Sequence, residues 1–222
     1  MLPLCLFDCD GTLVDSQHTI IAAMQAAFAS VEREPPSAQA IREVVGLSLT
    51  DAVAVLLGAE AAETRRVAAA YVAATKSMRT PTDGLEPIFP GVRDGLDVLD
   101  AEGWLLGIAT GKSRRALDDT LTEHALTGRF VTLQTADRAA GKPAPDMVFR
   151  AIAETGGELS RTVVVGDSVF DMQMARHAGA TAFGVAWGYH PVDALRAEGA
   201  QAVARTFPEL LLLLAGWVST SR

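Results

Sequence analysis

The sequence of 222 residues predicts an α/β protein with a mostly parallel sheet, and three observations carry this prediction. From residue 87 onward, short apolar runs alternate with amphipathic helical patterns, which is typical of parallel strands joined by helical crossovers. The apolar runs are nearly continuous, as expected for strands that are buried on both faces. Residues 17–81 show only helical patterns, which indicates a helical insertion after the first strand.

The first strand is expected at residues 4–7, and it runs directly into the sequence Asp8-Cys9-Asp10-Gly11-Thr12. The insertion that follows is expected to hold four Ala-rich helices, with Ser37 and Ser48 or Thr50 as N-caps of the second and third. The patterns place these helices at residues 20–31, 37–45, 48–57 and 59–78. We therefore expect a core domain of residues 1–16 and 82–222 and a helical domain of residues 17–81.

The rest of the chain supplies the remaining elements of the core. Pro145 in the first turn of one helix and Gly179 after the end of another mark helix boundaries. Helices are expected at residues 90–101, 113–125, 145–154, 170–178, 191–198 and 208–214. Strands are expected at residues 104–109, 130–133, 162–165, 181–185 and 201–204.

The charge and the cysteines limit the classes of function. There are 27 Asp plus Glu against 19 Lys plus Arg, a formal net charge of −8, which argues against nucleic acid and anionic membranes as partners. The apolar run at residues 210–218 is far shorter than the roughly 20 residues of a membrane-spanning helix. If Cys5 and Cys9 lie on one strand they are roughly 13 Å apart, too far to form a disulfide, so both are expected to be free thiols in a reducing cytosol. We expect a cytoplasmic monomer or homodimer with a small-molecule substrate.

Polar residues follow four of the predicted strands, at the carboxyl ends where parallel α/β sheets bind their ligands. These residues are Asp8, Asp10, Thr110, Lys142, Asp167 and Asp171. The clustered carboxylates cannot all stay ionised unless a cation joins them, and hard oxygen ligands of this kind select Mg²⁺. The sequence therefore predicts a magnesium site at this edge of the sheet.

The same residues suit phosphoryl transfer. A carboxylate beside Mg²⁺ and Lys142 can attack a phosphorus atom, because both cations screen the approach of two anions. A second carboxylate two residues later can protonate the leaving oxygen and then deprotonate the hydrolytic water. Thr110 and the backbone N–H groups after it, at the mouth of a helix, suit the phosphoryl oxygens.

Four motifs of the sequence closely resemble those of the haloacid dehalogenase superfamily of phosphatases. The family pattern hhhDxDGTLhDS, where h is apolar, is matched by residues 4–16. The apolar run before Thr110-Gly111, the sequence Gly141-Lys142-Pro143-Ala144-Pro145 and residues 163–172 match the other three. The resemblance implies a three-layer, Rossmann-like core with a mobile helical cap inserted after the first strand.

The resemblance also implies roles for individual residues. Asp8 would be the nucleophile that forms an aspartyl phosphate, and Asp10 the general acid and base. Lys142 would hold the nucleophile and the phosphate, while Thr110 and Gly111 would bind phosphate. The implied Mg²⁺ ligands are Asp8, the backbone carbonyl of Asp10, Asp167 and, through water or by orienting Lys142, Asp171.

Within the superfamily, the phosphoglycolate phosphatase-like branch matches best, but other reactions stay open. In β-phosphoglucomutase-like mutases a cap histidine usually lies twelve residues after the nucleophile; here Ile20 has that place, although His18 is close. A 2-haloacid dehalogenase-type hydrolase does not need the second acid, Asp10. A receiver-type switch that is phosphorylated on aspartate has no need of a leaving-group acid either.

The residues that contact the leaving group are less well defined by the sequence. Arg42 and Arg79 are predicted to bind substrate. Ser48 and Thr50, near a turn at Gly46, are further candidates, together with the cations Lys76 and Lys112 and the histidines His18 and His190.

Overall fold

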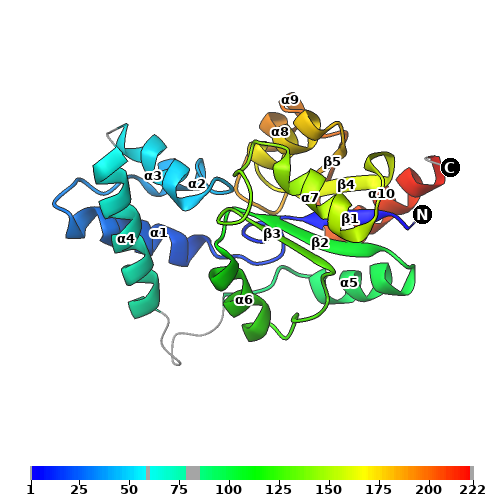
Figure 1. Cartoon of the computed structure of the whole chain (residues 1–222), viewed down its shortest axis with the longest axis horizontal. Helices are drawn as coiled ribbons and strands as arrows, with labels where there is room; N and C mark the ends of the chain where they lie inside the picture. The colour runs from blue at the N-terminus through cyan, green and yellow to red at the C-terminus, as the bar shows by residue number, and fades with distance from the viewer. Residues whose placement is uncertain (1, 59–60, 79–85, 221–222) are drawn as a thin grey trace.

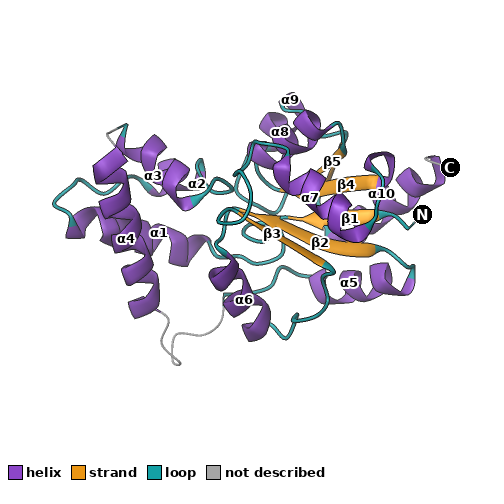
Figure 2. Cartoon of the chain, in the orientation of Figure 1, coloured by secondary structure: helices purple, strands orange, loops and turns teal. Residues whose placement is uncertain are grey.

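The structure, a computed structural model, describes residues 2–58, 61–78 and 86–220. At its centre is a six-stranded sheet in the order β3-β2-β1-β4-β5-β6, in which every neighbouring pair is parallel (Figure 2). The strands are β1 (Leu4–Phe7), β2 (Leu105–Thr110), β3 (Thr132–Thr135), β4 (Thr162–Gly166), β5 (Thr181–Val185) and β6 (Ala202–Ala204). The predicted α/β class and parallel sheet are confirmed.

Helices cover both faces of the sheet, because alternate side chains of each strand point to opposite faces. Leu4 and Leu6 of β1 pack with α7, α8 and α9, whereas Cys5 and Phe7 pack with α5, α6 and α10. These helices are α5 (Val92–Ala101), α6 (Arg114–Glu123), α7 (Asp146–Thr155), α8 (Val169–Ala178), α9 (Val192–Ala197) and α10 (Phe207–Thr220), with a short 3-10 turn at Leu159–Arg161. The result is the expected three-layer core, and both cysteines are buried free thiols, also as expected.

The other four helices follow β1 and lie together to one side of the sheet, on the left in Figure 1. They are α1 (Gln17–Ser30), α2 (Ala38–Arg42), α3 (Leu49–Leu57) and α4 (Ala61–Met78). They have an apolar cluster of their own, with Phe28, Ile41, Val53 and Val67 buried in it. We call residues 17–78 the cap. Its domain boundaries stay a prediction, since residues 79–85 are outside the described part of the chain.

Several elements differ from their predicted bounds. The strand β3 spans Thr132–Thr135 and not residues 130–133, and its polar side chains are satisfied by α7: Thr132 Oγ1 donates to Glu154 at 2.6 Å. The helix α10 continues to Thr220, because Trp217 stacks on Trp104 and donates to Thr181 Oγ1 at 3.0 Å. The helix α2 is shorter than predicted and ends at Arg42.

No helix in the described ranges is long and apolar enough to cross a membrane.

Candidate active site

The site lies where the strand order changes direction. The chain moves from β1 outward to β2 and β3, then returns to β4 on the other side of β1, and ligands of open α/β sheets bind at such a switch point. Asp8 follows β1 and Asp167 follows β4, so the two carboxylates come from neighbouring strands. The turn after β1 passes very close to the second of them. A Cβ on Gly11, whose φ is +80°, would lie 2.2 Å from Asp167 Oδ2, so this position requires glycine.

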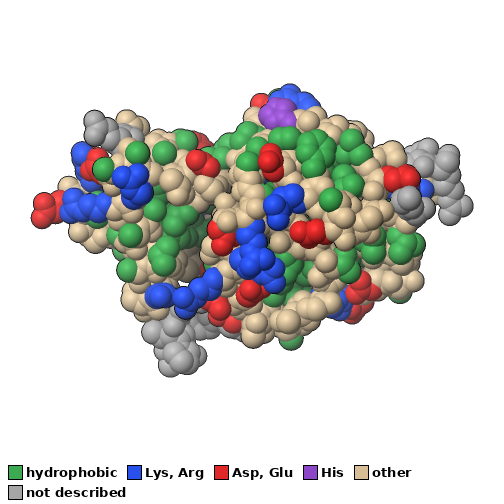
Figure 3. All heavy atoms as spheres, viewed as in Figure 1, with side chains coloured by type: hydrophobic (Ala, Val, Ile, Leu, Met, Phe, Trp, Pro, Cys, Tyr) green, Lys and Arg blue, Asp and Glu red, His purple; other side chains and the backbone are tan. Residues whose placement is uncertain are grey.

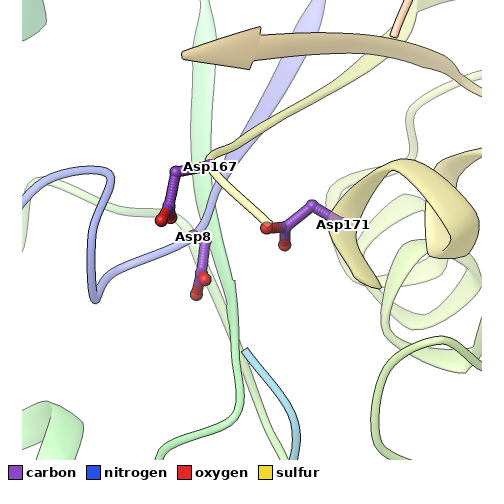
Figure 4. A group of neighbouring side chains, drawn as sticks. All are labelled: Asp8, Asp167 and Asp171. Carbon is purple, nitrogen blue, oxygen red and sulfur yellow. The ribbon is translucent and has the colours of Figure 1, made fainter. Parts of the chain in front are cut away.

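Three aspartates form the centre of the site (Figure 4). Carboxylate oxygens of Asp8, Asp167 and Asp171 all lie within 4.8 Å of one another, and none of the three residues is more than 2% exposed. Thr12 Oγ1 and the Tyr189 backbone N–H each donate to Asp167 at 2.9 Å, which fixes its orientation. Three buried carboxylates at this separation repel one another strongly, so the group has the donors and the charge to hold a cation.

Lys142 brings a buried positive charge to the same group. Its Nζ lies 2.9 Å from Asp8 Oδ1 and 2.6 Å from Asp171 Oδ1, and its side chain is 0% exposed. Asp171 is itself held by the capping box of α8, because its Oδ2 accepts from the Ser168 backbone N–H at 3.1 Å and from Ser168 Oγ at 2.7 Å. One of the two roles expected for Asp171, orienting Lys142, therefore has a direct structural basis.

Burial and charge shift the protonation equilibria of these groups. Burial raises the pKa of Asp8 to about 7; the ion pair with Lys142 lowers it, while Asp171 and Asp10 add to the rise. Burial and the charge of Asp8 raise the pKa of Asp167 well above its ordinary value. For Lys142, burial favours the neutral amine, but Asp171 and Asp8 outweigh it, so its pKa lies above the ordinary value. Without a bound cation, the carboxylates are therefore not all ionised at neutral pH.

Asp10 lies apart from the three-aspartate group and has different partners. Its Oδ1 is 2.8 Å from Lys112 Nζ and also accepts a short hydrogen bond from Ser16 Oγ. The Ser16 backbone N–H in turn donates to the Tyr189 hydroxyl at 2.9 Å. This placement fits a carboxylate that serves the leaving group and not a metal ion, and the expected metal contribution of Asp10 through its backbone carbonyl stays a prediction.

Lys112 is the functional candidate that the sequence placed least well. It was one of several open cations, yet its side chain is only 16% exposed and is paired with Asp10. Burial disfavours its ammonium, but Asp10 outweighs burial and raises the pKa of Lys112 above its ordinary value. The feature of the sequence that could have singled out Lys112 is its position two residues after Thr110, in the loop at the end of a strand.

Thr110 ends β2 beside the cap, and Gly111 follows it. Thr110 is 1% exposed, and its Oγ1 accepts from the Lys112 backbone N–H at 3.3 Å. A Cβ on Gly111 would lie 2.2 Å from the backbone oxygen of Leu47, so the cap approaches the core closely here. Backbone N–H groups of this loop are suited to bind phosphoryl oxygens.

The cap covers the site through its residues 46–51, which form the end of the α2–α3 loop and the first turn of α3. A Cβ on Gly46 would lie 2.6 Å from Ser168 Oγ, and one on Gly141 would lie 3.4 Å from Asp51 Oδ2. Asp8 is only 2% exposed beneath this segment.

The other predicted cap residues have partners within the cap, are exposed, or fall outside the described residues. Arg42 donates from Nε to Gln17 Oε1 at 3.0 Å, while Lys76, Thr50 and His18 are exposed. Ser48 caps α3 and pairs with Asp51. Arg79 falls on residues that the structure does not describe. Substrate binding by Arg42 and Arg79 therefore stays a prediction.

His190 lies in the loop after β5, where its role is to hold neighbouring segments. Its Nδ1 accepts from the Val169 backbone N–H at 3.4 Å, and its ring meets Phe170 edge-on at 5.8 Å.

Known proteins match this chain along most of its length. The family model described as "Haloacid dehalogenase-like hydrolase" matches residues 5–185. The chain belongs to this family. "Probable phosphatase IndB" of Dickeya dadantii (strain 3937) is 35% identical to it, over 95% of this chain and 93% of the relative. A phosphoglycolate phosphatase of Caulobacter vibrioides is 33% identical, over 86% and 83%.

A solved structure described as a hydrolase from Pseudomonas syringae has a TM-score of 0.85 to this chain, at 26% identity, and covers 96% of this chain and 98% of its own. The predicted family, the likeness to its phosphoglycolate phosphatase branch and the enzyme class, a phosphoric monoester hydrolase, are confirmed. The mutase and dehalogenase alternatives gain no support from these relatives, which are named as phosphatases.

Proposed function

We propose that this protein is a Mg²⁺-dependent phosphatase that hydrolyses a small, phosphoglycolate-like phosphate monoester through an aspartyl phosphate on Asp8. One observation carries the proposal: the Asp8 carboxylate is buried against Lys142 and shares a compact group with Asp167 and Asp171. A lone buried carboxylate would simply stay protonated. A carboxylate that is paired with a lysine and grouped with two more acids is instead equipped to act as a charged nucleophile beside a cation.

The donor set fits Mg²⁺. It consists of carboxylate oxygens, the ligands that hard divalent cations prefer, and the excess of buried negative charge over Lys142 needs a further cation. Asp8, Asp167 and the backbone carbonyl of Asp10 would hold the ion, with Asp171 contributing through Lys142 or a water molecule. The ion would supply positive charge that stabilises the transferring phosphoryl group.

Asp8 and Asp10 divide the chemistry between them. A carboxylate oxygen of Asp8 attacks phosphorus, and the bond from phosphorus to the ester oxygen breaks. Asp10 gives its proton to that oxygen, so the leaving group departs as an alcohol. Asp10 then takes a proton from water, whose oxygen attacks phosphorus of the aspartyl phosphate and releases inorganic phosphate, which restores Asp8 as a carboxylate and Asp10 as a protonated acid.

The other core residues hold the phosphoryl group during these steps. Lys142, whose Nζ already lies 2.9 Å from Asp8 Oδ1, neutralises charge as the two anions approach. The Thr110 hydroxyl and the N–H group of Gly111 lie at the end of the adjacent strand β2, where they can donate to phosphoryl oxygens.

The position of Lys112 favours a substrate that carries a second anionic group near the ester oxygen. Its ammonium lies beside Asp10, on the side where the leaving group would sit. Tyr71 of the cap helix α4 is close enough for the charges of Lys112 and Asp10 to act on it, and its burial raises the pKa of its phenol to about 12, so it stays neutral and able to donate. A buried ammonium and a phenol suit a carboxylate on the leaving group, and phosphoglycolate has one.

The proposed setting follows from the same features. The partner is a small molecule rather than nucleic acid or a membrane, the net charge of −8 being unfavourable for both. Two buried free thiols suit the reducing cytosol, and a monomer or homodimer would suffice, since the residues assigned above all come from one chain.

The test is a panel of phosphate esters, ranked by kcat/KM with Mg²⁺ and repeated with EDTA. Phosphoglycolate is expected near the top, and EDTA is expected to abolish turnover. The panel includes a hexose 1-phosphate assayed for isomerisation and a 2-haloacid assayed for halide release. Turnover of either of these in preference to every phosphate monoester, or hydrolysis that survives EDTA, would contradict the proposal.

A further inference from the structure

We propose that a second anion site lies at the open edge of the sheet, beside β3, and that it binds a small organic molecule with two or more carboxylate or phosphate groups. β3 is the last strand of the sheet and pairs only with β2. Its outer edge forms one wall of a cavity of about 250 Å³. The cavity is separate from the candidate active site, because none of its lining residues belongs to the aspartate group or contacts it.

Three arginines from three different segments line this cavity: Arg114 of α6, Arg138 of the loop after β3, and Arg150 of α7. One acid, Glu154, lines it as well. The lining therefore has an excess of positive charge in a protein whose net charge is −8. Figure 3 shows Lys and Arg side chains gathered in the middle of this face, with acids around them.

A buried polar network orients one of these arginines. Gln134 of β3 is 1% exposed, and its amide nitrogen donates to Glu154 at 2.7 Å and to Thr132 Oγ1 at 2.8 Å. These two bonds fix the amide, so its oxygen points to Arg150, which donates to it from Nε at 3.2 Å. Thr132 and Gln134 lower the pKa of Glu154 despite its partial burial, so Glu154 is a carboxylate that keeps the network in one arrangement. Only Nε of Arg150 has an acceptor in this network, which leaves its terminal nitrogens for a ligand.

Arg138 and Arg114 complete the site, and they differ in how firmly their side chains are held. Within the described ranges, Arg138 has no hydrogen bond or ion pair from its guanidinium, although the carboxylate of Asp137 is nearby. Arg114 is bound from Nε to Asp118 Oδ1 at 2.8 Å, which leaves its terminal nitrogens for a ligand. Asp137 is occupied by the Thr135 hydroxyl and the Arg114 backbone N–H.

The chemistry of the lining defines the ligand class. Guanidinium groups present planar pairs of N–H donors that match carboxylate and phosphate oxygens, and guanidinium groups on three segments require more than one anionic group to engage them. The volume of about 250 Å³ limits the ligand to the size of a small metabolite. The loop that carries Arg138 continues to Lys142, so the occupied site would also order the segment that leads to the active-site lysine.

The experiment is isothermal titration calorimetry with citrate and, separately, with pyrophosphate, in metal-free buffer with EDTA. Wild type is expected to bind at least one of the two probes with a stoichiometry of one, and the preferred probe distinguishes carboxylate from phosphate chemistry. The variant R138Q/R150Q is expected to bind that probe at least about tenfold more weakly. The matched control R65Q/R66Q removes the same charge from exposed positions of α4 and is expected to bind like wild type.

Arg138→Gln alone keeps the test decisive if the double variant fails to fold, since the Arg138 side chain is exposed and can be replaced without loss of a contact. It is expected to weaken binding several-fold. Two results would overturn the proposal: no binding of either probe by wild type, or equal binding by wild type, R138Q/R150Q and the single variant. Neither result depends on phosphatase activity, so the proposed function is tested separately.

Discussion

The active site at the carboxyl ends of the strands and the cap differ in how their charged groups are held. In the active site, Asp8, Lys142 and Asp171 are at most 2% exposed and pair with one another. In the cap, the ion pair between Arg33 and Glu63 is on the surface, with side chains 55% and 24% exposed. Removing one member of a buried charge network costs much folding free energy, because its partners are then buried charges with neither a counter-ion nor water around them. Removing one member of a surface pair costs little, because water solvates the remaining charge. The rate of phosphoryl transfer is therefore expected to depend on the residues at the carboxyl ends of the strands, and substrate choice on the few residues where the cap meets them.

Asp8→Asn should have the largest effect. The amide retains the shape of the side chain but is a poor nucleophile, so kcat should fall by about a thousandfold or more. The measurement is steady-state hydrolysis of the best substrate from the panel, with the melting temperature as a check on folding. Asp146→Asn, at an exposed position in the first turn of α7, is the matched control. A variant that folds and keeps a tenth of the activity would show that Asp8 is not the nucleophile.

Lys142→Met should reduce both activity and stability. It leaves Asp8 and Asp171 buried without their counter-ion, and loss of one partner of a buried pair costs about 3–5 kcal/mol. Without Lys142, the buried Asp8 loses the partner that lowers its pKa, so this pKa rises further above its ordinary value, and an acid with a raised pKa destabilises the folded state as pH increases. Urea unfolding of the metal-free protein should therefore show a larger loss at pH 8 than at pH 5. Lys76→Met in the exposed part of α4 should show neither effect, and an equal loss at the two pH values would contradict the buried-pair account.

Lys112→Met should separate substrate choice from chemistry. If Lys112 binds a second anionic group, KM for phosphoglycolate should rise about tenfold, while KM for phenyl phosphate, which lacks that group, should change less than about threefold. Equal changes in kcat for both substrates, with KM unaltered, would instead assign Lys112 to the orientation of Asp10.

The affinity for Mg²⁺ should decrease as the pH is lowered, by an amount that follows from the pKa of Asp8. Burial raises the pKa of Asp8 to about 7 in the metal-free protein, so below that pH a proton competes with the cation. From pH 8 to pH 6, Asp8 alone should weaken Mg²⁺ binding by roughly tenfold. The shift in melting temperature on adding Mg²⁺ should accordingly be larger at pH 8. A shift that is equal at both pH values would mean that Asp8 is already ionised without the metal.

The sequence could predict that Asp8, Lys142, Asp167 and Asp171 lie together at the carboxyl ends of the strands, because they stand in motifs with strict steric and hydrogen-bonding requirements. Gly11 is required by the approach of Asp167, and Asp171 both caps α8 and holds Lys142, so these positions admit few substitutes and form readable motifs. The strand order could not be derived from the motifs alone, but apolar runs and helical periodicity were enough for the class and for nearly all elements.

The sequence said less about polar residues whose partners are distant along the chain. The predicted strand at residues 130–133 stops before Gln134, because nothing local in the sequence shows that Glu154, far along the chain, accepts hydrogen bonds from Thr132 and Gln134. Lys112 looked like one surface cation among several, because its burial depends on how Asp10 and the cap helix α4 come together. Such contacts are set by tertiary packing and leave no local periodicity.

The central claim is a covalent phosphoryl group on Asp8, and the most direct measurement is acid quench of the enzyme during turnover, followed by mass spectrometry of its peptides. The account predicts one phosphoryl group on the peptide that contains Asp8, absent from Asp8→Asn and lost on treatment with hydroxylamine, which cleaves acyl phosphates. Rapid turnover without any such adduct at the earliest quench times, or an adduct on another residue, would contradict it.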